Sequence, residues 1–270
     1  MTKDFVKSLD EHRAQWDAEM RERWEAAETD LSFSEWKKQE FERRRAEQFA
    51  EDDARRKAEA HALRVEALSK QIPPRYRNAT TDHAELTAWV QRLLTWSQEL
   101  SSARRPVTVE GWGPTPYRSP TEPDVETQTA GPSLLLLGPT GVGKTHQAFA
   151  ALRQYVAEGG MATIRVATSA DMYAELRPRP GVDSEEVFGR YAKCPVLFID
   201  DLGAAKSSEW VEEINYRLIN YRWNHQLATL ITSNVPTRQL GEYLGERVAS
   251  RLNGMCSTTV LKGDDRRRAA

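Results

Sequence analysis

The chain has 270 residues, of which 39% are hydrophobic and 29% are charged, and its formal net charge is −2 at pH 7. This length suits one domain with a smaller additional element. The near-neutral charge excludes a global basic field, so any binding of DNA must come from a local patch. The two cysteines, Cys194 and Cys256, lack zinc-ligand spacing and provide no disulfide framework, as expected in a reducing cytosol. No signal-peptide core and no long apolar run occurs, so we expect a soluble, cytoplasmic protein without a membrane-spanning segment.

Residues 1–72 differ in composition from the rest of the chain. Roughly half of them are charged, with both signs mixed, and neither Gly nor Pro occurs before Pro73, so we expect helix. Ser32 followed by Glu35 fits a capping box, which predicts a second helix from about residue 33 to residue 71. The first helix carries an apolar stripe at a mostly i+4 spacing. The residues of this stripe are Phe5, Leu9, Trp16, Met20 and Trp24.

This predicted helical hairpin has too few large apolar side chains to fold strongly alone. Trp36, Phe41 and Phe49 lie on its second helix, and exposed aromatic side chains on such helices are usually docking groups. We therefore interpret residues 1–72 as a charged, partner-binding arm. The alternative is a solvated charged helix with no partner.

Residues 73–133 are predicted to form a short helix and a flexible linker. Pro73 and Pro74 end the arm, and the apolar pattern between residues 82 and 100 indicates a helix. Residues 101–133 are rich in Pro, Gly, Thr and Ser with little periodicity, which is typical of a linker or a long surface loop.

From Leu134 onward, apolar strands alternate with helices, which predicts an α/β fold with a five-stranded parallel sheet covered on both faces. The expected strands are 134–137, 162–166, 196–199, 229–232 and 258–261. The expected helices are about 143–157, 169–176, 184–193, 209–225, 237–243 and 245–252.

One Gly-rich turn in this region carries a specific motif. The sequence Gly-Pro-Thr-Gly-Val-Gly-Lys-Thr matches the phosphate-binding loop G-x-x-x-x-G-K-[ST] at every fixed position, between a predicted strand and a predicted helix. In such a loop backbone amides surround an anion, the lysine reaches the β- and γ-phosphates, and the hydroxyl holds Mg²⁺. We expect a nucleoside triphosphate to be bound by Gly138, Pro139, Thr140, Gly141, Val142, Gly143, Lys144, Thr145 and His146.

A second acidic motif follows a buried strand. Asp200 and Asp201 come directly after Val196–Ile199, as in the Walker B motif of nucleotide hydrolases. Asp200 is expected to contact Mg²⁺ together with Thr145, and Asp201 is expected to orient or deprotonate the attacking water. The alternative for paired acids at this place is a solvated strand end.

Four further polar residues are candidates for contact with the nucleotide. Asn234 follows a predicted strand and could contact the γ-phosphate or the attacking water, although Asn at a strand end is usually a turn former. Arg247 and Arg251 share one helical face and could serve a neighbouring subunit, although surface salt bridges are the usual fate of helical arginines. An arginine of the basic tail, such as Arg266, could reach the nucleotide within the same subunit, or the tail could be disordered or touch phosphates.

Taken together, these pieces resemble the AAA+ ATPases of the DnaC/IstB type, which comprise replicative helicase loaders and transposition helper ATPases. The resemblance covers about three quarters of the chain. It rests on the segments Ile72–Thr80, Gly138–His146, Phe198–Gly203, Thr232–Asn234 and Gly245–Leu252.

The resemblance implies ATP and Mg²⁺ as cofactors and a role for each matching residue. Asp200 and Asp201 match the Walker B acids and Asn234 matches sensor 1, while Arg251 matches the arginine finger and Arg266 the second sensor arginine. It also implies an AAA+ fold without a C-terminal helical lid. Residues 169–193 occupy the place where family members carry extra helices that grip single-stranded DNA.

The sequence departs from the family at two places. Some loaders begin with a zinc-binding module, which this chain lacks, and the 101–133 segment is longer than the family pattern.

Two functions remain open on sequence grounds. In the first, the arm docks on a hexameric replicative DNA helicase, and ATPase domains assemble as a homo-oligomer that places the helicase on single-stranded DNA. In the second, the chain is a transposition helper that oligomerises on duplex DNA. A metabolic P-loop kinase is disfavoured, because no second substrate site is evident and the paired arginines suit a subunit interface.

Overall fold

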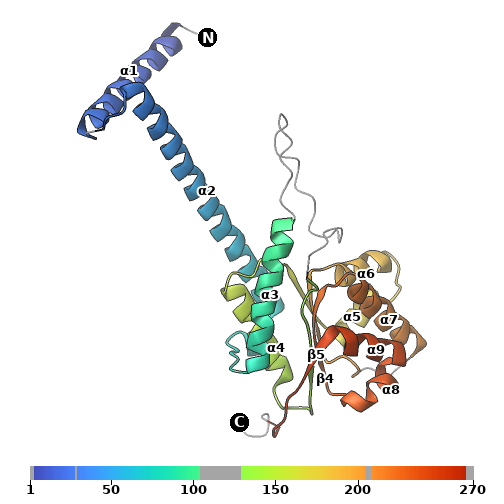
Figure 1. Cartoon of the computed structure of the whole chain (residues 1–270). Coiled ribbons are helices and arrows are strands. Elements are labelled where there is room, and N and C mark those ends of the chain that lie inside the picture. The colour runs from blue at the N-terminus through green and yellow to red at the C-terminus, as the bar shows by residue number, and fades with distance from the viewer. Residues whose placement is uncertain (1–2, 28, 104–128, 205–207, 266–270) are drawn as a thin grey trace. The chain divides into compact units, whose positions relative to one another are not determined.

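The computed structural model describes residues 3–27, 29–103, 129–204 and 208–265 (Figure 1). The chain divides into two compact units, Met1–Ala60 and His61–Ala270, which are treated separately below. The domain boundaries expected after residues 72 and 133 stay predictions. Most of the predicted linker, residues 104–128, lies outside the described residues, as do the side chains of Phe5 and Leu9 in the expected apolar stripe.

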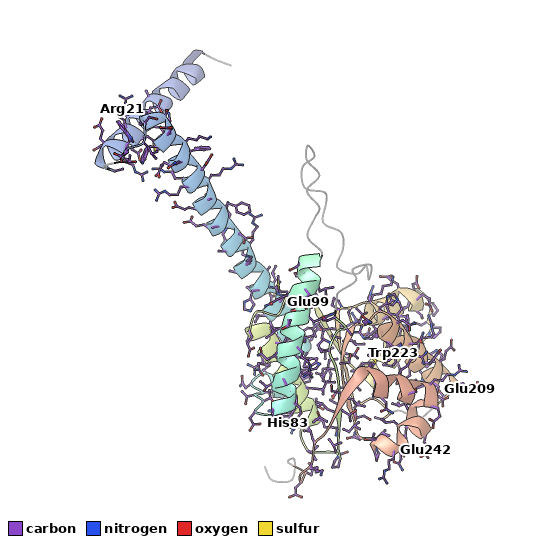
Figure 2. All side chains as sticks on the ribbon, in the orientation of Figure 1. Arg21, His83, Glu99, Glu209, Trp223 and Glu242 are labelled. Atoms are coloured by element: carbon purple, nitrogen blue, oxygen red, sulfur yellow. The ribbon has the colours of Figure 1, made fainter. Side chains whose placement is uncertain are left out.

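The first unit is a pair of helices, α1 (Lys3–Ala26) and the first part of α2 (Phe33–Gln71). Met20 is fully buried between them, and the ring of Trp24 meets the ring of Phe33 edge-on at 5.7 Å. Arg21, labelled in Figure 2, lies over the other side of the Phe33 ring, with its guanidinium carbon 4.9 Å from the centroid. Met20, Trp24 and Phe33 therefore form an apolar contact between the two helices.

A buried glutamate adds a charged network to the same contact. The carboxylate of Glu40 is 6% exposed and pairs with Arg23 of α1 at 2.8 Å, as well as with Arg43 and Arg44 of its own helix. Hydrogen bonding from Arg43 lowers the pKa of Glu40, so the carboxylate stays ionised between the two helices.

The turn between the helices is the predicted capping box. The amide of Ser32 donates to Glu35 Oε2 at 3.1 Å, and the amide of Glu35 donates to Ser32 Oγ at 3.4 Å. The Ser32 hydroxyl also lowers the pKa of Glu35 by hydrogen bonding to its carboxylate. These reciprocal bonds satisfy amide groups that a helix start leaves free, which explains why α2 begins at Phe33.

The second unit contains a five-stranded, fully parallel sheet with the order β2-β3-β4-β1-β5. The predicted α/β fold class is confirmed. The register pairs Leu137 of β1 with Ser233 of β4, so the segments that follow these two strands leave the sheet at the same edge. The strands are β1 (Ser133–Leu137), β2 (Ile164–Thr168), β3 (Val196–Asp200), β4 (Ala228–Ser233) and β5 (Cys256–Val260).

Helices cover both faces of this sheet (Figure 1). Successive leucines of β1 point to opposite faces of the sheet. Leu134 and Leu136 belong to the core under α3 and α4, whereas Leu135 and Leu137 belong to the core on the side of α5 to α9. A strand buried on both faces is apolar at every position, which explains its run of leucines. The helices are α3 (Ala84–Ala103), α4 (Lys144–Ala157), α5 (Ser169–Leu176), α6 (Ser184–Ala192), α7 (Glu209–Asn224), α8 (Leu240–Leu244) and α9 (Glu246–Met255), with 3₁₀ turns at Pro74–Tyr76 and Thr237–Gln239.

Two parts of the core were not evident from composition. Helix α3 packs against α4, and its Leu86, Trp89 and Leu93 are fully buried. The last turn of α2 and the residue that follows it join the same core through Leu68 and Ile72. The sheet is therefore covered on this face by residues that come before the Gly-rich loop in the chain.

The two edge strands differ by one or two residues from their predicted bounds. β2 is 164–168 instead of 162–166, and β5 is 256–260 instead of 258–261. Edge strands pair on one side only and contain polar as well as apolar residues. The apolar run in the sequence therefore does not show where such a strand begins and ends. Thr168 is the last residue of β2 and also the N-cap of α5, because its hydroxyl accepts a hydrogen bond from the amide of Asp171.

A fully buried arginine joins α7 to the sheet. Arg222 donates from Nε to Thr229 Oγ1 at 2.9 Å, from Nη1 to the carbonyl of Cys194 at 2.8 Å and from Nη2 to the carbonyl of Ala228 at 2.5 Å. Carbonyls just before β3 and at the start of β4 thus receive donors from a single side chain. The guanidinium thereby ties α7 to two neighbouring strands of the sheet.

We predict that Arg222→Leu lowers the free energy of unfolding by about 3 kcal/mol, because the buried carbonyls lose their donors and the leucine cannot replace them. Urea unfolding of the full-length variant measures this. Arg190→Leu removes an exposed pair with Glu186 and should cost no more than about 0.5 kcal/mol. Equal losses in the two variants would contradict the assigned role of Arg222.

Candidate functional site

The loop between β1 and α4 has a backbone that only glycine adopts readily. Gly138 and Gly143 have φ angles of 148° and 98°, and a Cβ at Gly138 would lie 2.4 Å from the carbonyl oxygen of Leu261. Helix α4 begins at Lys144, and no side chain caps its N-terminus. Its first amide groups are therefore available to an anion, which the helix dipole also favours.

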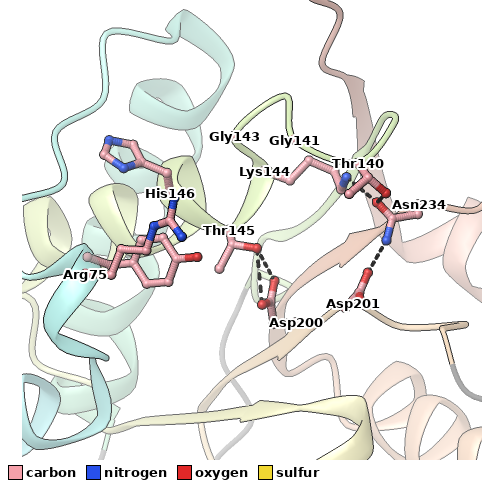
Figure 3. A pocket seen from close by; sticks show the side chains of 11 residues that line it. Arg75, Thr140, Gly141, Gly143, Lys144, Thr145, His146, Asp200, Asp201 and Asn234 are labelled. Atoms are coloured by element: carbon pink, nitrogen blue, oxygen red, sulfur yellow. Dashed lines mark hydrogen bonds between the residues drawn. The ribbon is translucent and has the colours of Figure 1, made fainter. Parts of the chain in front are cut away.

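This loop borders a cavity of about 440 Å³ at the carboxyl edge of the sheet (Figure 3). The structure brings together nine residues predicted for the site, while Gly138, Pro139 and Val142 belong to the loop without lining the cavity. Arg75 and Tyr76 complete the rim. The residues around the cavity are Arg75, Tyr76, Thr140, Gly141, Gly143, Lys144, Thr145, His146, Asp200, Asp201 and Asn234.

Lys144 is held inside the loop by three acceptors. Its side chain is 7% exposed, and Nζ donates to the carbonyls of Gly138 and Pro139 at 2.8 and 2.9 Å and to Asn234 Oδ1 at 2.6 Å. The ammonium therefore sits over the concave face of the loop, where phosphate oxygens would lie. A bound phosphate can take over some of these bonds without a rearrangement of the chain.

Asp200 accepts two hydroxyl groups at the base of the cavity. Thr145 Oγ1 donates to Asp200 Oδ1 at 2.9 Å, and Thr232 Oγ1 donates to the same oxygen at 2.5 Å. Burial raises the pKa of Asp200, and the neighbouring Asp201 adds to this effect, while both hydroxyl bonds oppose it. A buried carboxylate whose charge is poorly compensated fits a cation site.

The donor set of Thr145 and Asp200 consists of hard oxygen atoms, as Mg²⁺ requires. Within the described ranges, no cluster of three or more His, Cys, Asp or Glu side chains is placed to hold a metal ion. A Mg²⁺ ion here would therefore take its remaining ligands from water and from phosphate oxygens, which is its usual arrangement in nucleotide sites.

Asp201 and Asn234 lie on the side of the cavity opposite Arg75 and His146, with Thr145 between the two sides (Figure 3). Asp201 has a φ of 59°, which is rare for a residue other than glycine, and its amide donates to Thr232 Oγ1 at 2.8 Å. Asn234 Nδ2 donates to Asp201 Oδ1, while Asn234 Oδ1 accepts from Lys144. One amide side chain thus links the lysine of the loop to the second acid.

Arg75 and Tyr76 line the cavity, although no role follows for them from the sequence pattern. The two prolines before them end α2 and start a 3₁₀ turn, which brings this segment to α4. The Tyr76 ring stacks on Phe149 at 5.1 Å and meets the ring of His146 edge-on at 6.4 Å. An aromatic wall therefore flanks the helix that follows the loop.

The two arginines expected at the nucleotide are placed differently. Arg251 lies on α9 and does not line the cavity; its Nε donates to Asn220 Oδ1 at 2.8 Å. Arg266 lies outside the described residues. The preceding Asp265 is described, and a Cβ at Gly141 would lie 1.9 Å from its Oδ1, so residue 265 reaches the Gly-rich loop.

A search of the described residues for membrane spans finds no helix that is both long and apolar enough for a bilayer. This finding agrees with the sequence, which lacks a long apolar run.

Comparison with known proteins identifies the family. The model of the IstB-like ATP binding protein family matches residues 127–267, which is more than half of the chain and includes the cavity-lining residues from Thr140 to Asn234. The chain belongs to this family. The resemblance to DnaC/IstB-type AAA+ ATPases is thereby confirmed, and membership implies nucleotide binding.

Curated relatives match a shorter stretch of the chain. The replicative helicase loader DnaC of Escherichia coli (strain K12) is 24% identical over 123 residues, which are 44% of this chain and 49% of that protein. DnaC of Buchnera aphidicola subsp. Baizongia pistaciae (strain Bp) is 27% identical over 124 residues, 44% of this chain and 50% of that protein. The match thus spans about half the length of these relatives.

A solved structure supports the fold. The crystal structure of DnaI aligns with a TM-score of 0.51 at 20% identity and covers 72% of this chain and 94% of that one. At this identity the likeness shows the AAA+ architecture.

We predict that Asp200→Asn stabilises the chain in the absence of nucleotide. Burial raises the pKa of Asp200, so the folded state holds its proton more tightly than the unfolded state, and ionisation at neutral pH lowers stability. Thermal unfolding at pH 7.5 should give a higher midpoint for Asp200→Asn. The difference should shrink as the pH falls through the raised pKa, because protonation removes the same charge.

The exposed carboxyl of Glu242 on α8 provides the control, since Glu242→Gln should leave the midpoint unchanged. A lower midpoint for Asp200→Asn at pH 7.5 would contradict the burial of an uncompensated charge.

Proposed function

We propose that this chain is an ATP-dependent loader of the replicative DNA helicase onto single-stranded DNA. It binds the helicase through its N-terminal unit and hydrolyses ATP in an oligomeric AAA+ assembly. The convergence of Lys144, Thr145, Asp200, Asp201 and Asn234 on one cavity carries the proposed ATPase activity. The similarity of part of this chain to DnaC, a replicative helicase loader, supports helicase loading as the function.

In the proposed reaction, the amides of the Gly-rich loop and Lys144 hold the β- and γ-phosphates. Thr145 and Asp200 hold Mg²⁺, which when bound neutralises the charge that develops on the phosphates. Tyr76, His146 and Arg75 form the rim on the other side of Thr145, where a purine base would find an aromatic surface and a cation.

Asp201 then orients the attacking water and accepts its proton. The unusual φ of Asp201 and its bond from Asn234 fix the carboxylate in one place. Asn234 also accepts a hydrogen bond from Lys144. A phosphate that binds the lysine ammonium can therefore weaken this bond and change the position of the Asn234 amide. The γ-phosphate and the attacking water are thereby coupled through a single side chain.

Arg251 has no place in the cavity of its own subunit and is proposed to complete the site of the next copy. An arginine supplied in this way stabilises the transition-state charge and contributes about 10³–10⁵ in rate. Arg266, one residue beyond Asp265, is proposed to reach the nucleotide of its own subunit.

Single-stranded DNA is proposed to bind at the segment of α5 and α6. Arg165, Arg179 and Arg190 surround a cavity there, but Arg165 pairs with Glu175 at 3.2 Å and Arg190 pairs with Glu186 at 2.7 Å. These pairs leave few positive charges for phosphates, so we expect a shallow dependence of DNA affinity on salt.

The alternative function is a transposition helper of the IstB type that oligomerises on duplex DNA, which the description of the matching family favours. The first unit argues against it, because acidic side chains outnumber basic ones in residues 1–60 and phosphates would be repelled. Affinities for single- and double-stranded DNA of equal length separate the two functions, since a loader prefers the single strand and a helper the duplex.

We predict that Lys144→Ala lowers ATP turnover on the order of 10²-fold or more, because the phosphates lose the ammonium that the loop holds against them. Steady-state hydrolysis measures turnover, and calorimetry with ATP and Mg²⁺ measures binding. Lys193→Ala, an exposed lysine at the end of α6, should leave both unchanged. Unchanged turnover in Lys144→Ala would refute the site.

For the arm, we predict that replacing both Phe41 and Phe49 by alanine weakens binding to the hexameric replicative helicase of the same genome by at least about tenfold, as expected for aromatic anchors. Their side chains are 55% and 67% exposed on α2. Leu63→Ala, which removes an equally exposed apolar residue of the second unit, should have little effect. Fluorescence anisotropy with the full-length chain measures the affinity.

Absence of binding by the unsubstituted chain at micromolar concentration would contradict helicase loading. An equal loss in Leu63→Ala would contradict docking through the first unit.

A further inference from the structure

Two arginines of α9 lie over the same aromatic ring of α7. The guanidinium carbons of Arg247 and Arg251 are 5.7 and 5.2 Å from the centroid of the Tyr216 ring. Among the described residues, only Arg251 of the two makes a hydrogen bond as well, because its Nε donates to Asn220 Oδ1 at 2.8 Å. Arg247 is exposed, whereas Arg251 is partly buried.

The bond from Nε leaves the other end of the Arg251 guanidinium available. Within the residues that the structure describes, its terminal nitrogens Nη1 and Nη2 have no hydrogen bond or ion pair. Four N–H groups in a planar fork therefore remain, and such a fork matches the oxygens of a phosphate. This is the arrangement that an arginine acting on a bound phosphate needs.

The holding residues come from one helix at helical spacing. Tyr216 and Asn220 are four residues apart on α7, as Arg247 and Arg251 are on α9, so each pair shares a face. The two helices lie side by side in Figure 1 and are in contact. Gly254 allows their close approach, since a Cβ there would lie 2.8 Å from the ring of Trp223, which Figure 2 labels.

We propose that Asn220 and Tyr216 are positioning residues, which hold the guanidinium of Arg251 in the orientation that it uses on the γ-phosphate of a neighbouring copy. This inference rests on the proposed role of Arg251 in the assembly. A free arginine has many rotamers, and fixing one of them before the subunits meet removes an entropy cost from the reaction. The bond to Asn220 distinguishes Arg251 from Arg247, since both arginines lie over Tyr216.

Mixing two inactive variants tests this proposal in the full-length chain. Arg251→Ala subunits keep an intact site but supply no arginine, and Lys144→Ala subunits supply the arginine but cannot use ATP. We call the Lys144→Ala subunit the donor of the arginine and the Arg251→Ala subunit the acceptor. Turnover in the mixture then reports only the action of the donor's Arg251 on the acceptor's site. We expect the mixture to regain turnover that neither variant shows alone.

Adding Asn220→Ala to the Lys144→Ala donor should lower the regained turnover about threefold to tenfold, the range expected for one lost hydrogen bond. Asn220→Asp in the donor should restore it, because a carboxylate oxygen accepts the same bond. Tyr216→Phe should retain turnover, whereas Tyr216→Leu should lower it to a similar extent. Arg247→Ala in the donor is the control and should leave turnover unchanged.

The acceptor distinguishes positioning from a general structural effect. Asn220→Ala placed in the Arg251→Ala acceptor should change nothing, since no guanidinium is left to hold; an equal drop there would overturn the proposal. Full turnover with the Asn220→Ala donor would overturn the positioning role alone. Failure of the Lys144→Ala donor to restore any turnover would overturn the proposed action of Arg251 between subunits, and this inference with it.

Discussion

The ammonium of Lys144 is the contact on which the candidate site depends. It bonds to two carbonyls of its own loop and to Asn234, and Asn234 in turn bonds to Asp201. The parallel sheet makes this possible, because β1, β3 and β4 are adjacent and end at one edge. The Gly-rich loop, the acid pair and the amide therefore meet although they are far apart in the chain. Any change in the order of these strands would separate them.

This arrangement has a cost in stability. Asp200 is buried with a raised pKa, Asp201 has an unfavourable backbone angle, and the start of α4 has no side-chain cap. Each of these features weakens the folded chain without ligand and favours a phosphate or a cation at the same place. Stabilising contacts lie elsewhere, in the double-sided core around β1 and in the bonds of Arg222.

Much of this fold was predictable because its signals are local. The leucine run of β1 indicates a strand that is buried on both faces, and the glycines after it indicate a phosphate-binding loop. The confirmed fold class followed from the alternation of strands and helices. The capping box at Ser32 was found in the same way. Proximity of Asp200, Asp201 and Asn234 could be expected, since each follows an apolar strand; their chemical roles stay predictions.

Other features depend on contacts between distant segments and leave no mark on the sequence. The packing of α3 on α4, the approach of Tyr76 to His146 and the burial of Arg222 are of this kind. Asn220 and Tyr216 look like ordinary polar positions of a surface helix until α9 is placed beside them. Sequence patterns report what a segment buries, but not which polar side chain it meets.

The most direct test of the candidate site is calorimetric titration of the unsubstituted chain with ATP, in the presence and absence of Mg²⁺. Binding that strengthens when Mg²⁺ is added is predicted, because Thr145 and Asp200 would share the ion with the phosphates. An absence of binding heat at millimolar ATP with Mg²⁺, at two temperatures so that a zero enthalpy is not mistaken for no binding, would contradict a triphosphate site at Gly138–Thr145.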